Sequence, residues 1–312
     1  MRTHSHWTDL APADRGASVA MGNFDGVHLG HQAVIAQAAA AGGPLGAPLG
    51  IVTFEPHPRQ HFAPAAPPFR LMNAEARANR LEKLGVGQLY ELPFDGRLAG
   101  MDAEAFVAEV LVAGLGVRHV TVGADFCFGK GRKGTTETLS ALGAHFGFGV
   151  TVAELVAFQG LEVSSTNIRA ALAEGRPRDA ATMLGHWHRI EGEVIHGEKR
   201  GRALGFPTAN MGVEALHLPR LGVYAVKVDV LTGPQAGSYG GAASVGVRPM
   251  FGENQPNLES FLFDFSGDLY GQHLSVAFID YLRPELKFDG LPALMAQIDA
   301  DCDKARAILA TL

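Results

Sequence analysis

The chain contains Ser18-Val19-Ala20-Met21-Gly22-Asn23-Phe24-Asp25-Gly26-Val27-His28-Leu29-Gly30-His31, in which a short apolar run passes through glycine into a segment with two histidines. Residues 18–21 predict a buried strand, and the alanine-rich residues 30–41 predict a helix that Gly42-Gly43-Pro44 ends. A strand that turns through glycine into a helix presents free backbone N–H groups at the start of the helix. This order predicts an α/β domain that binds phosphate after its first strand.

The same alternation continues outward from this segment through the first half of the chain. Strands are expected at residues 49–54, 88–92, 119–122 and 150–153, and helices at 73–84, 102–115 and 135–146, the first of them capped by Asn73. Strands that alternate with helices of this length predict a parallel sheet with helices on both faces. Ligands of such sheets bind at the carboxyl ends of the strands, where the two histidines follow.

The pattern changes in the second half of the chain. Strand-like runs at 190–196, 223–230, 241–245, 258–265 and 273–281 are separated by turns rich in Gly, Pro and Asn, which is typical of an antiparallel sheet or barrel. The last segment has an apolar stripe at helical spacing, from Leu291 to Leu309, and predicts a helix packed over that sheet. We therefore expect two domains, residues 1–185 and residues 186–312.

Composition excludes several classes of protein. The 312 residues carry a net charge of -6, which argues against binding of nucleic acid through a basic surface. The only two cysteines, Cys127 and Cys302, argue against a disulfide framework or a zinc site and fit a reducing compartment. Residues 1–17 do not resemble a signal peptide, and no run of eighteen apolar residues occurs. We expect a cytoplasmic protein with no membrane-spanning segment.

Two further features suit phosphate chemistry in the first half. His28 and His31 are three residues apart, so on a helix they share one face and can stabilise a phosphorus centre by hydrogen bonds and positive potential. Ser164-Ser165-Thr166-Asn167-Ile168-Arg169 offers hydroxyl donors at a helix start and a guanidinium that can grip phosphate. The alternatives are capping or zinc-binding histidines, and a simple N-cap followed by an exposed arginine.

The second half contains its own glycine-flanked turn, Gly201-Arg202-Ala203-Leu204-Gly205-Phe206-Pro207-Thr208-Ala209-Asn210. This turn lacks the Gly-Lys-Ser/Thr ending of a Walker loop, but its backbone amides could still cradle phosphates. The Thr208 hydroxyl and the Asn210 amide oxygen are hard ligands, suited to a Mg²⁺ ion held mostly by ATP and water. The candidate phosphate-binding residues are Gly201, Gly205, Pro207, Thr208 and Asn210, and the last two are the candidate metal ligands.

The run Leu258-Glu259-Ser260-Phe261-Leu262-Phe263-Asp264-Phe265 contains one carboxylate among aromatic residues. Alternation along a strand places Glu259 on the same face as Phe261, Phe263 and Phe265. Such a carboxylate is a candidate general base, and the alternative is an exposed glutamate on an edge strand.

These motifs together resemble a known pair of enzyme families. The Gly22–His31 string resembles the ATP-binding motif of nucleotidylyltransferases, in the form carried by prokaryotic FAD synthetases. Segments 53–58, 123–134 and 164–169 resemble further blocks of that family in the same order. The Pro207-Thr208-Ala209-Asn210 string resembles the signature of riboflavin kinases, and the resemblance continues through residues 222–226, 244–251, 258–265, 268–271 and 282–288. The whole chain, over about residues 15 to 310, is similar to prokaryotic bifunctional riboflavin kinase/FAD synthetases.

The resemblance implies a Rossmann-like nucleotidylyltransferase domain with a parallel sheet, followed by a mainly β riboflavin-kinase barrel with a C-terminal helix. It implies riboflavin, FMN, FAD and ATP as the small-molecule partners, with Mg²⁺ accompanying ATP in both reactions, in a monomer or weak homo-oligomer. The implied catalytic residues are Glu259, His28 and His31. The implied ATP-binding residues of the adenylyltransferase are Gly22, Asn23, Phe24, Asp25, His28, His31, Ser164, Ser165, Thr166 and Arg169.

The same resemblance implies two flavin-binding sites. The site in the first domain has Asp125, Phe126 and Phe128 as its candidate residues. An aromatic ring there could stack on the isoalloxazine, and packing in the core is the alternative. The site in the second domain has Arg283 as its candidate residue. Two other functions stay open: a different nucleotidylyltransferase fused to a flavin-binding barrel, and a flavin-binding regulator without enzymatic activity.

Overall fold

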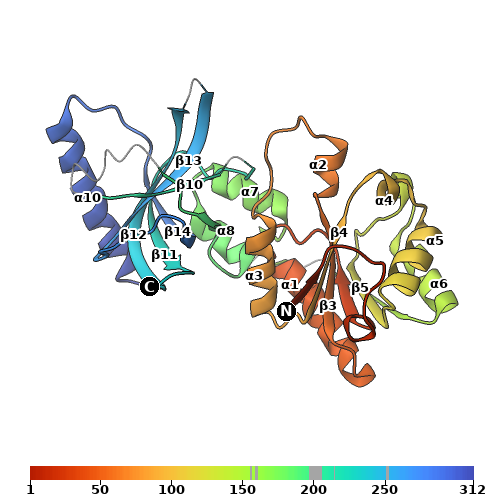
Figure 1. The fold of residues 1–312 in the computed structure, drawn as a ribbon. Helices are drawn as coiled ribbons and strands as arrows, with labels where there is room; N and C mark the ends of the chain where they lie inside the picture. Colours follow the sequence, from red (N-terminus) through yellow and green to blue (C-terminus); the bar gives the residue numbers. More distant parts are fainter. Residues whose placement is uncertain (155–156, 159–160, 197–205, 214, 251–252) are drawn as a thin grey trace. The chain divides into compact units, whose positions relative to one another are not determined.

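The computed structural model describes residues 1–312 except 155–156, 159–160, 197–205, 214 and 251–252 (Figure 1). The chain folds into two compact units. The first comprises Met1–Pro67 and Arg77–Val163, and the second comprises Pro68–Ala76 and Ser164–Leu312. Helices α7 (Ser165–Ala173) and α8 (Pro177–Leu184) belong to the second unit. The functional division at residue 185 stays a prediction.

The first unit contains the predicted parallel sheet, in the order β1–β4–β3–β2–β5–β6. Its strands are β1 (Arg2–His4), β2 (Ser18–Met21), β3 (Leu49–Glu55), β4 (Gln88–Pro93), β5 (His119–Gly123) and β6 (Gly149–Ala153). A separate two-stranded sheet joins β7 (Ala157–Phe158) to β8 (Leu161–Glu162). The five strands of the large sheet expected from sequence are present, and β1 adds an edge strand.

Helical segments connect these strands: α1 (Leu29–Gly42), α2 (Pro58–Phe62), α3 (Ala74–Lys83), α4 (Gly96–Gly100), α5 (Ala103–Ala105) and α6 (Thr136–Phe146). Short 3-10 turns lie at η1 (Pro12–Asp14), η2 (Gly43–Leu45) and η4 (Lys130–Arg132). The helix expected at 102–115 is interrupted, because α5 passes into η3 (Phe106–Gly114), which has π-helical bonding. Asn73 caps α3 as expected, since its Oδ1 accepts the Ala76 N–H at 2.8 Å.

Helices cover both faces of the large sheet. On strand β2, Val19 and Met21 belong to the core cluster that includes Val110 of η3. Ser18 alternates with them and its hydroxyl donates to the Ala38 carbonyl of α1 at 2.6 Å. Because successive strand residues point to opposite faces, α1 and η3 lie on opposite sides of the sheet.

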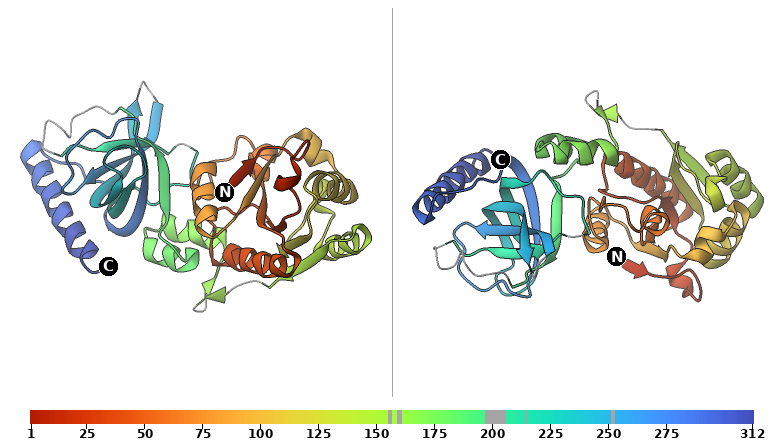
Figure 2. Two further views of the ribbon diagram at one scale, coloured as in Figure 1. Left: turned by 60° about the horizontal axis from the view of Figure 1, so that its bottom comes forward. Right: turned by 90° about the horizontal axis from the view of Figure 1, so that it is seen from above.

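The second unit is the predicted antiparallel barrel, in the order β10–β13–β12–β11–β14–β9 (Figure 2). Its strands are β9 (Arg189–Glu193), β10 (Ala209–Gly212), β11 (Gly222–Val230), β12 (Gly237–Met250), β13 (Glu253–Leu262) and β14 (His273–Arg283). Just past β9, the Ile195 N–H bonds to the Asn210 carbonyl of β10 at 2.9 Å. This bridge joins the two ends of the sheet, and the interior is filled by residues such as Tyr224, Val245 and Phe278.

Helix α10 (Leu291–Leu309) packs on the outside of this barrel, as expected. Cys302 and Ala305 are buried against strand residues that include Ala225 and Ile279. The start of the expected stripe does not join this contact, because Leu291 is 57% exposed.

Strand β13 ends earlier than the expected run 258–265. It stops at Leu262, and Asp264 takes a positive φ of 55° that turns the backbone away from strand geometry. Glu259 and Phe261 share a strand face, and Phe263 packs on the same side, with its ring 5.9 Å from that of Phe261 in the cluster that includes Cys302 of α10. Phe265 packs instead with the interior of the barrel, so the expectation of one aromatic face is wrong at this residue alone.

Candidate active sites

The loop between β2 and α1 has a constrained backbone. The Gly22 N–H bonds to the Val52 carbonyl of β3 at 3.1 Å, and the Gln32 side chain donates to the Val27 carbonyl at 2.8 Å. Phe24 and Val27 have positive φ values of 53° and 43°, which are unfavourable for residues with a Cβ, above all for a branched one. Strain of this kind persists where the surrounding structure enforces it, which is common at binding sites.

The structure brings the two predicted histidines together at the start of α1. His28 is the N-cap residue, and its Nδ1 accepts the His31 backbone N–H at 3.3 Å. The two imidazole rings stack with centroids 3.6 Å apart and planes 17° apart. Gly30 lies against this pair, since a Cβ there would come within 3.2 Å of the His28 ring. The capping role that the sequence left open is therefore real, and it orients the His28 ring.

His31 has a protonation state that the sequence did not predict. Burial, and then the neighbouring His28 when charged, hold the pKa of His31 well below its usual range. His31 is therefore neutral at pH 7 and offers a hydrogen bond rather than a positive charge. Within the described residues, its buried Nδ1 has no hydrogen-bond partner.

The other residues of this motif belong to the same loop between β2 and α1. Asn23 is held through its backbone carbonyl, which accepts the Thr53 hydroxyl of β3 at 3.2 Å. Asp25 is buried, and the Phe24 ring lies 5.2 Å from the ring of His31. The structure thus places six predicted residues on one loop and the first turn of α1, and their joint binding of ATP stays a prediction: Gly22, Asn23, Phe24, Asp25, His28 and His31.

The three candidate flavin-binding residues of the first unit, Asp125, Phe126 and Phe128, differ in how far they are buried. Phe128 is buried in the core beside Phe106, with ring centroids 5.8 Å apart, so it has the packing role that the sequence left as the alternative. Phe126 stacks on Phe128 at 5.8 Å and is half-buried, and Asp125 is exposed. The flavin contact of these three residues stays a prediction.

Sequence reasoning missed a line of aromatic rings near the ends of β3 and β4. Phe54 contacts Phe94 edge to face at 5.6 Å, and Phe94 contacts Phe62 of α2 at 5.7 Å. Phe62 is 69% exposed, which is unusual for a large apolar side chain. These residues come from separate segments, so only the expectation that strand ends meet at one edge could have pointed to them.

The segment 164–169 lies at the start of α7 in the second unit. Ser164 is the N-cap, and its hydroxyl accepts the Asn167 N–H at 3.2 Å. Ser165 is half-buried and Thr166 exposed in the first turn. Arg169 donates to the Phe69 carbonyl at 3.4 Å, and its guanidinium lies 6.0 Å from the Phe69 ring. It stays a prediction that these residues bind ATP together with the histidines.

The barrel brings the predicted kinase residues side by side. Asn210 on β10 lies directly opposite Glu259 on β13, and Glu259 lies opposite Ser244 on β12. Directly opposed residues of neighbouring antiparallel strands share one face at a separation of about 5 Å. The Asn257 side chain donates to Glu259 Oε1 at 3.0 Å, and the Asn210 side chain donates to the Thr208 carbonyl at 3.4 Å. Pro207 is exposed just before β10, and Gly201 and Gly205 lie outside the described residues.

Arg283 lies on the same face at the far end of this cross-strand row, which continues from Ser244 through Val223 to Arg283. Its guanidinium forms an ion pair with Asp301 of α10, with Nη2 at 2.7 Å from Oδ2 and Nε at 2.9 Å. The Gln297 side chain donates to the same carboxylate at 3.0 Å. Arg283 therefore anchors α10 to the barrel, and its predicted flavin contact stays a prediction.

Comparison with known proteins identifies the family of this chain. The FAD synthetase family matches residues 10–167, and the riboflavin kinase family matches residues 184–309. This chain belongs to the bifunctional riboflavin kinase/FMN adenylyltransferase family. A relative of that name from Pseudomonas fluorescens is 43% identical over 97% of this chain and 96% of its own length. One from Listeria monocytogenes is 38% identical over 99% of this chain and 96% of its own. The family predicted from the sequence is confirmed.

A solved structure supports the same fold for this family member. It is titled a macrolide-efflux protein from Streptococcus pneumoniae, is 31% identical, covers 98% of both chains and has a TM-score of 0.83. In the part of this chain that the structure describes, no helix is both long and apolar enough to cross a membrane.

The oxygen donors of the predicted kinase residues are of the kind that fits a magnesium ion. Thr208, Asn210 and Glu259 bring a hydroxyl, an amide and a carboxylate oxygen to one region, and Mg²⁺ prefers oxygen ligands completed by water and phosphate. Among the described residues, no three His, Cys, Asp or Glu side chains gather as a metal-binding cluster.

Proposed function

We propose that this chain makes FAD from riboflavin in two steps. Residues 186–312 transfer the γ-phosphate of ATP to the 5′-hydroxyl of the ribityl chain, which gives FMN and ADP. Residues 1–185 then transfer the adenylyl group of a second ATP to FMN, which gives FAD and pyrophosphate. The observation that carries the proposal is the direct cross-strand pairing of Glu259 with Asn210, beside Thr208, in a chain of this family.

In the kinase step, Glu259 accepts the proton of the attacking ribityl hydroxyl. The hydrogen bond from Asn257 orients its carboxylate, which is held on β13, a strand paired on both sides with β10 and β12, rather than on a loop. Thr208 and Asn210 would hold Mg²⁺ and the phosphates, and the ion supplies neutralisation of triphosphate charge when it is bound. Gly201, Gly205 and Pro207 belong to the same proposed phosphate site, and Arg283 to the flavin site. Positioning and charge neutralisation account for most of the rate in such reactions.

In the adenylylation step, an FMN phosphate oxygen attacks the α-phosphorus of ATP, and pyrophosphate leaves. A phosphate monoester is already ionised at neutral pH, so the step requires neither a side-chain nucleophile nor a general base. His28 and His31 stabilise the transition state by hydrogen bonds at the N-terminus of α1. Gly22, Asn23, Phe24, Asp25, Ser164, Ser165, Thr166 and Arg169 complete the proposed ATP site, and Asp125, Phe126 and Phe128 the proposed FMN site.

The proposal includes small molecules only as partners: riboflavin, FMN, FAD and ATP. It also includes a monomer or weak homo-oligomer in the cytoplasm, without nucleic acid or membrane. Size-exclusion chromatography with light scattering measures the assembly state.

The test is incubation with riboflavin, ATP and Mg²⁺, followed by chromatographic separation of riboflavin, FMN and FAD over time. We expect Glu259→Gln to lower FMN formation by about 10²- to 10⁴-fold, the usual range for loss of a general base, while FMN-to-FAD conversion stays normal. His31→Ala should do the reverse and accumulate FMN. Loss of both steps in the Glu259 variant, with the fold intact, would refute the division of labour.

The rival functions are tested in the same assay. Phosphopantetheine or nicotinamide mononucleotide in place of FMN tests for a different nucleotidylyltransferase, and we expect no adenylylated product. Binding of flavin without consumption of ATP would support the non-enzymatic regulator instead.

A further inference from the structure

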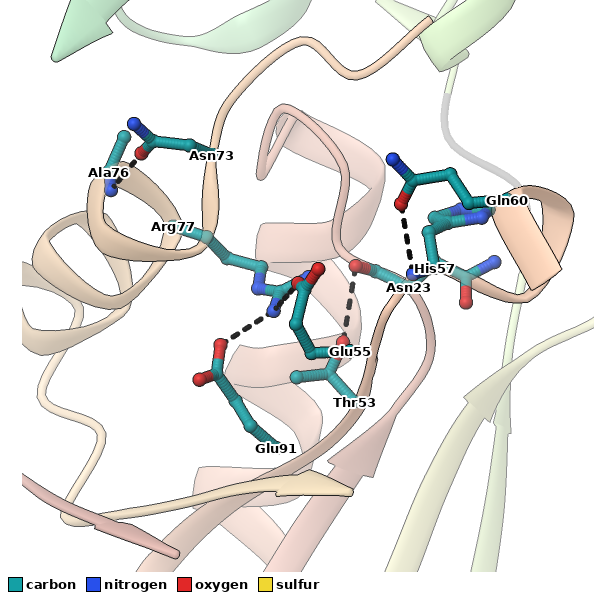
Figure 3. Close-up of polar contacts among 9 residues, drawn as sticks. All are labelled: Asn23, Thr53, Glu55, His57, Gln60, Asn73, Ala76, Arg77 and Glu91. Atoms are coloured by element: carbon teal, nitrogen blue, oxygen red, sulfur yellow. Dashed lines mark hydrogen bonds and ion pairs between the residues drawn. The ribbon is translucent and has the colours of Figure 1, made fainter. Parts of the chain in front are cut away.

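We propose that Arg77 is a positioning residue of the adenylyl-transfer site, which holds the Glu55 carboxylate away from the triphosphate of ATP. The inference rests on the proposed function of the first unit. Arg77 lies on α3, and its side chain is fully buried. Its Nη2 lies 2.9 Å from Glu55 Oε2 and 2.6 Å from Glu91 Oε1. Figure 3 shows the Arg77 side chain reaching both glutamates.

The two carboxylates come from the carboxyl halves of neighbouring parallel strands. Thr53 of β3 pairs with Glu91 of β4, and Glu55 lies two residues further along β3. Glu55, Thr53 and Glu91 therefore share one face of the sheet, and one guanidinium binds carboxylates from both strands. The Glu55 side chain is 37% exposed and the Glu91 side chain 17%. Glu55 is thus the carboxylate with more access to a bound ligand.

Glu55 lies next to the loop that carries the histidines. Thr53 donates to the Asn23 carbonyl at 3.2 Å, so β3 runs beside the first residues after β2 (Figure 3). Glu55 is one step closer than Thr53 to the carboxyl edge of the sheet, where ligands of parallel sheets bind. An unneutralised carboxylate at this position would repel the phosphates of ATP.

The hydrogen bonds of Arg77 are not arranged as they would be if the residue served only to stabilise the fold. Its Nε and Nη1 are buried and have no hydrogen-bond partner in the described part of the chain, although both ion pairs use Nη2. Buried donors without partners are costly, and an isolated structural ion pair would be better served by a guanidinium that donates from several nitrogens. The arrangement instead places one positive charge between two carboxylates, which draws Glu55 toward α3 and offsets part of the negative charge of the pair without exposing the arginine.

Removal of the Arg77 charge should therefore weaken ATP binding more than the chemical step. For Arg77→Gln we expect the KM for ATP in FMN-to-FAD conversion to rise about tenfold, as one repulsive charge near the triphosphate would cause, with kcat changed by less than about threefold. The riboflavin kinase activity of the same chain serves as the internal control and should not change.

The two carboxylates provide the matched comparison. Arg77→Gln combined with Glu55→Gln should return the KM for ATP to near the wild-type value, because the repelling charge is gone. The other double variant, Arg77→Gln with Glu91→Gln, also removes one unpaired buried carboxylate. It should leave the KM for ATP raised, because Glu55 keeps its charge. Equal recovery in both double variants would overturn the inference, because it would reduce Arg77 to a partner for buried charge. An unchanged KM in a folded Arg77→Gln variant would also overturn it.

If the Arg77 variant does not fold, the single variant Glu55→Gln tests the inference through its KM for ATP. The inference expects a KM for ATP at or below the wild-type value, and a raised KM would instead make Glu55 a ligand of ATP. Failure of the proposed function gives a different result, since the wild-type chain would then form no FAD at all.

Discussion

Acidification should destabilise the second unit through one buried histidine. His188 directly precedes β9, is 2% exposed, and lies with its ring 5.7 Å from that of Phe278. Burial lowers the pKa of His188 to about 3, and the charges of His186 and His217 act in the same direction. In the described residues its Nε2 has no hydrogen-bond partner, so a proton there would be held without compensation.

The size of the effect follows from proton linkage. The unfolded chain binds a proton at His188 with an ordinary pKa of 6.5, whereas the folded chain does so only near pH 3. Between these values the unfolded state holds more protons, so the free energy of unfolding falls as the pH decreases below about 6.5. At pH 5 the loss is about RT ln(1 + 10^1.5), or about 2 kcal/mol. The figure barely depends on the folded pKa, provided that this value lies well below 5.

Denaturant unfolding of the second unit at pH 7.5 and pH 5.0 measures this loss. We expect the wild type to lose about 2 kcal/mol more between the two pH values than His188→Gln does. The exposed His196, replaced by Gln, is the matched control and should leave the wild-type pH dependence intact. The contributions of all other titrating groups are the same in the wild type and the variants, so they cancel when the losses are compared. Equal losses in the wild type and the His188 variant would refute the reasoning.

Two further substitutions test contacts at the proposed sites. Asp301→Asn leaves Arg283 without its counter-ion at a largely buried position, so we expect a loss of about 3 kcal/mol in the free energy of unfolding, measured by denaturant titration; an unchanged value would contradict the anchoring role. Gly30→Ala places a Cβ 3.2 Å from the His28 ring, so FAD formation should fall several-fold while FMN formation is unchanged. A normal rate of FAD formation would show that the position of this ring does not matter.

The sheet of the first unit could be predicted from sequence because each central strand is a short apolar run between glycine-rich or polar turns. Strand β2 is buried at all four residues, so its apolar pattern reflects its place in the middle of the sheet. Strand β1 could not be found in this way. It has three polar or charged residues, and only pairing with β4 at the edge makes it a strand.

The sequence predicted which residues belong to the kinase site, but not which of them face one another. Thr208, Asn210 and Glu259 were identified by motif, and nothing in the motif says that Asn210 faces Glu259. That contact depends on the strand order β10–β13–β12, in which a short strand pairs with one much later in the chain. Strand order is set by packing of the whole barrel, so a local pattern does not contain it.

Arg77 was missed for a different reason. A charged residue on a helix is expected on the solvent face, and the sequence around Arg77 contains other charged residues that meet this expectation. Its burial follows from Glu55 and Glu91, which reach it from β3 before α3 and from β4 after it, a contact that depends on how the helix packs on the sheet. Only the three-dimensional structure identifies this residue as different from its neighbours.

The neutral state of His31 makes the charge at Glu55 more important. The sequence led us to expect positive potential from both histidines, but burial keeps His31 uncharged at neutral pH. In the loop itself, the N-terminus of α1 then supplies a partial positive charge of about half a unit toward the phosphates. A full negative charge on Glu55, at the end of the adjacent strand, would outweigh that contribution. In the proposed adenylyl-transfer site, Arg77 is the group that lets hydrogen bonds and the dipole of α1 suffice on this side of ATP.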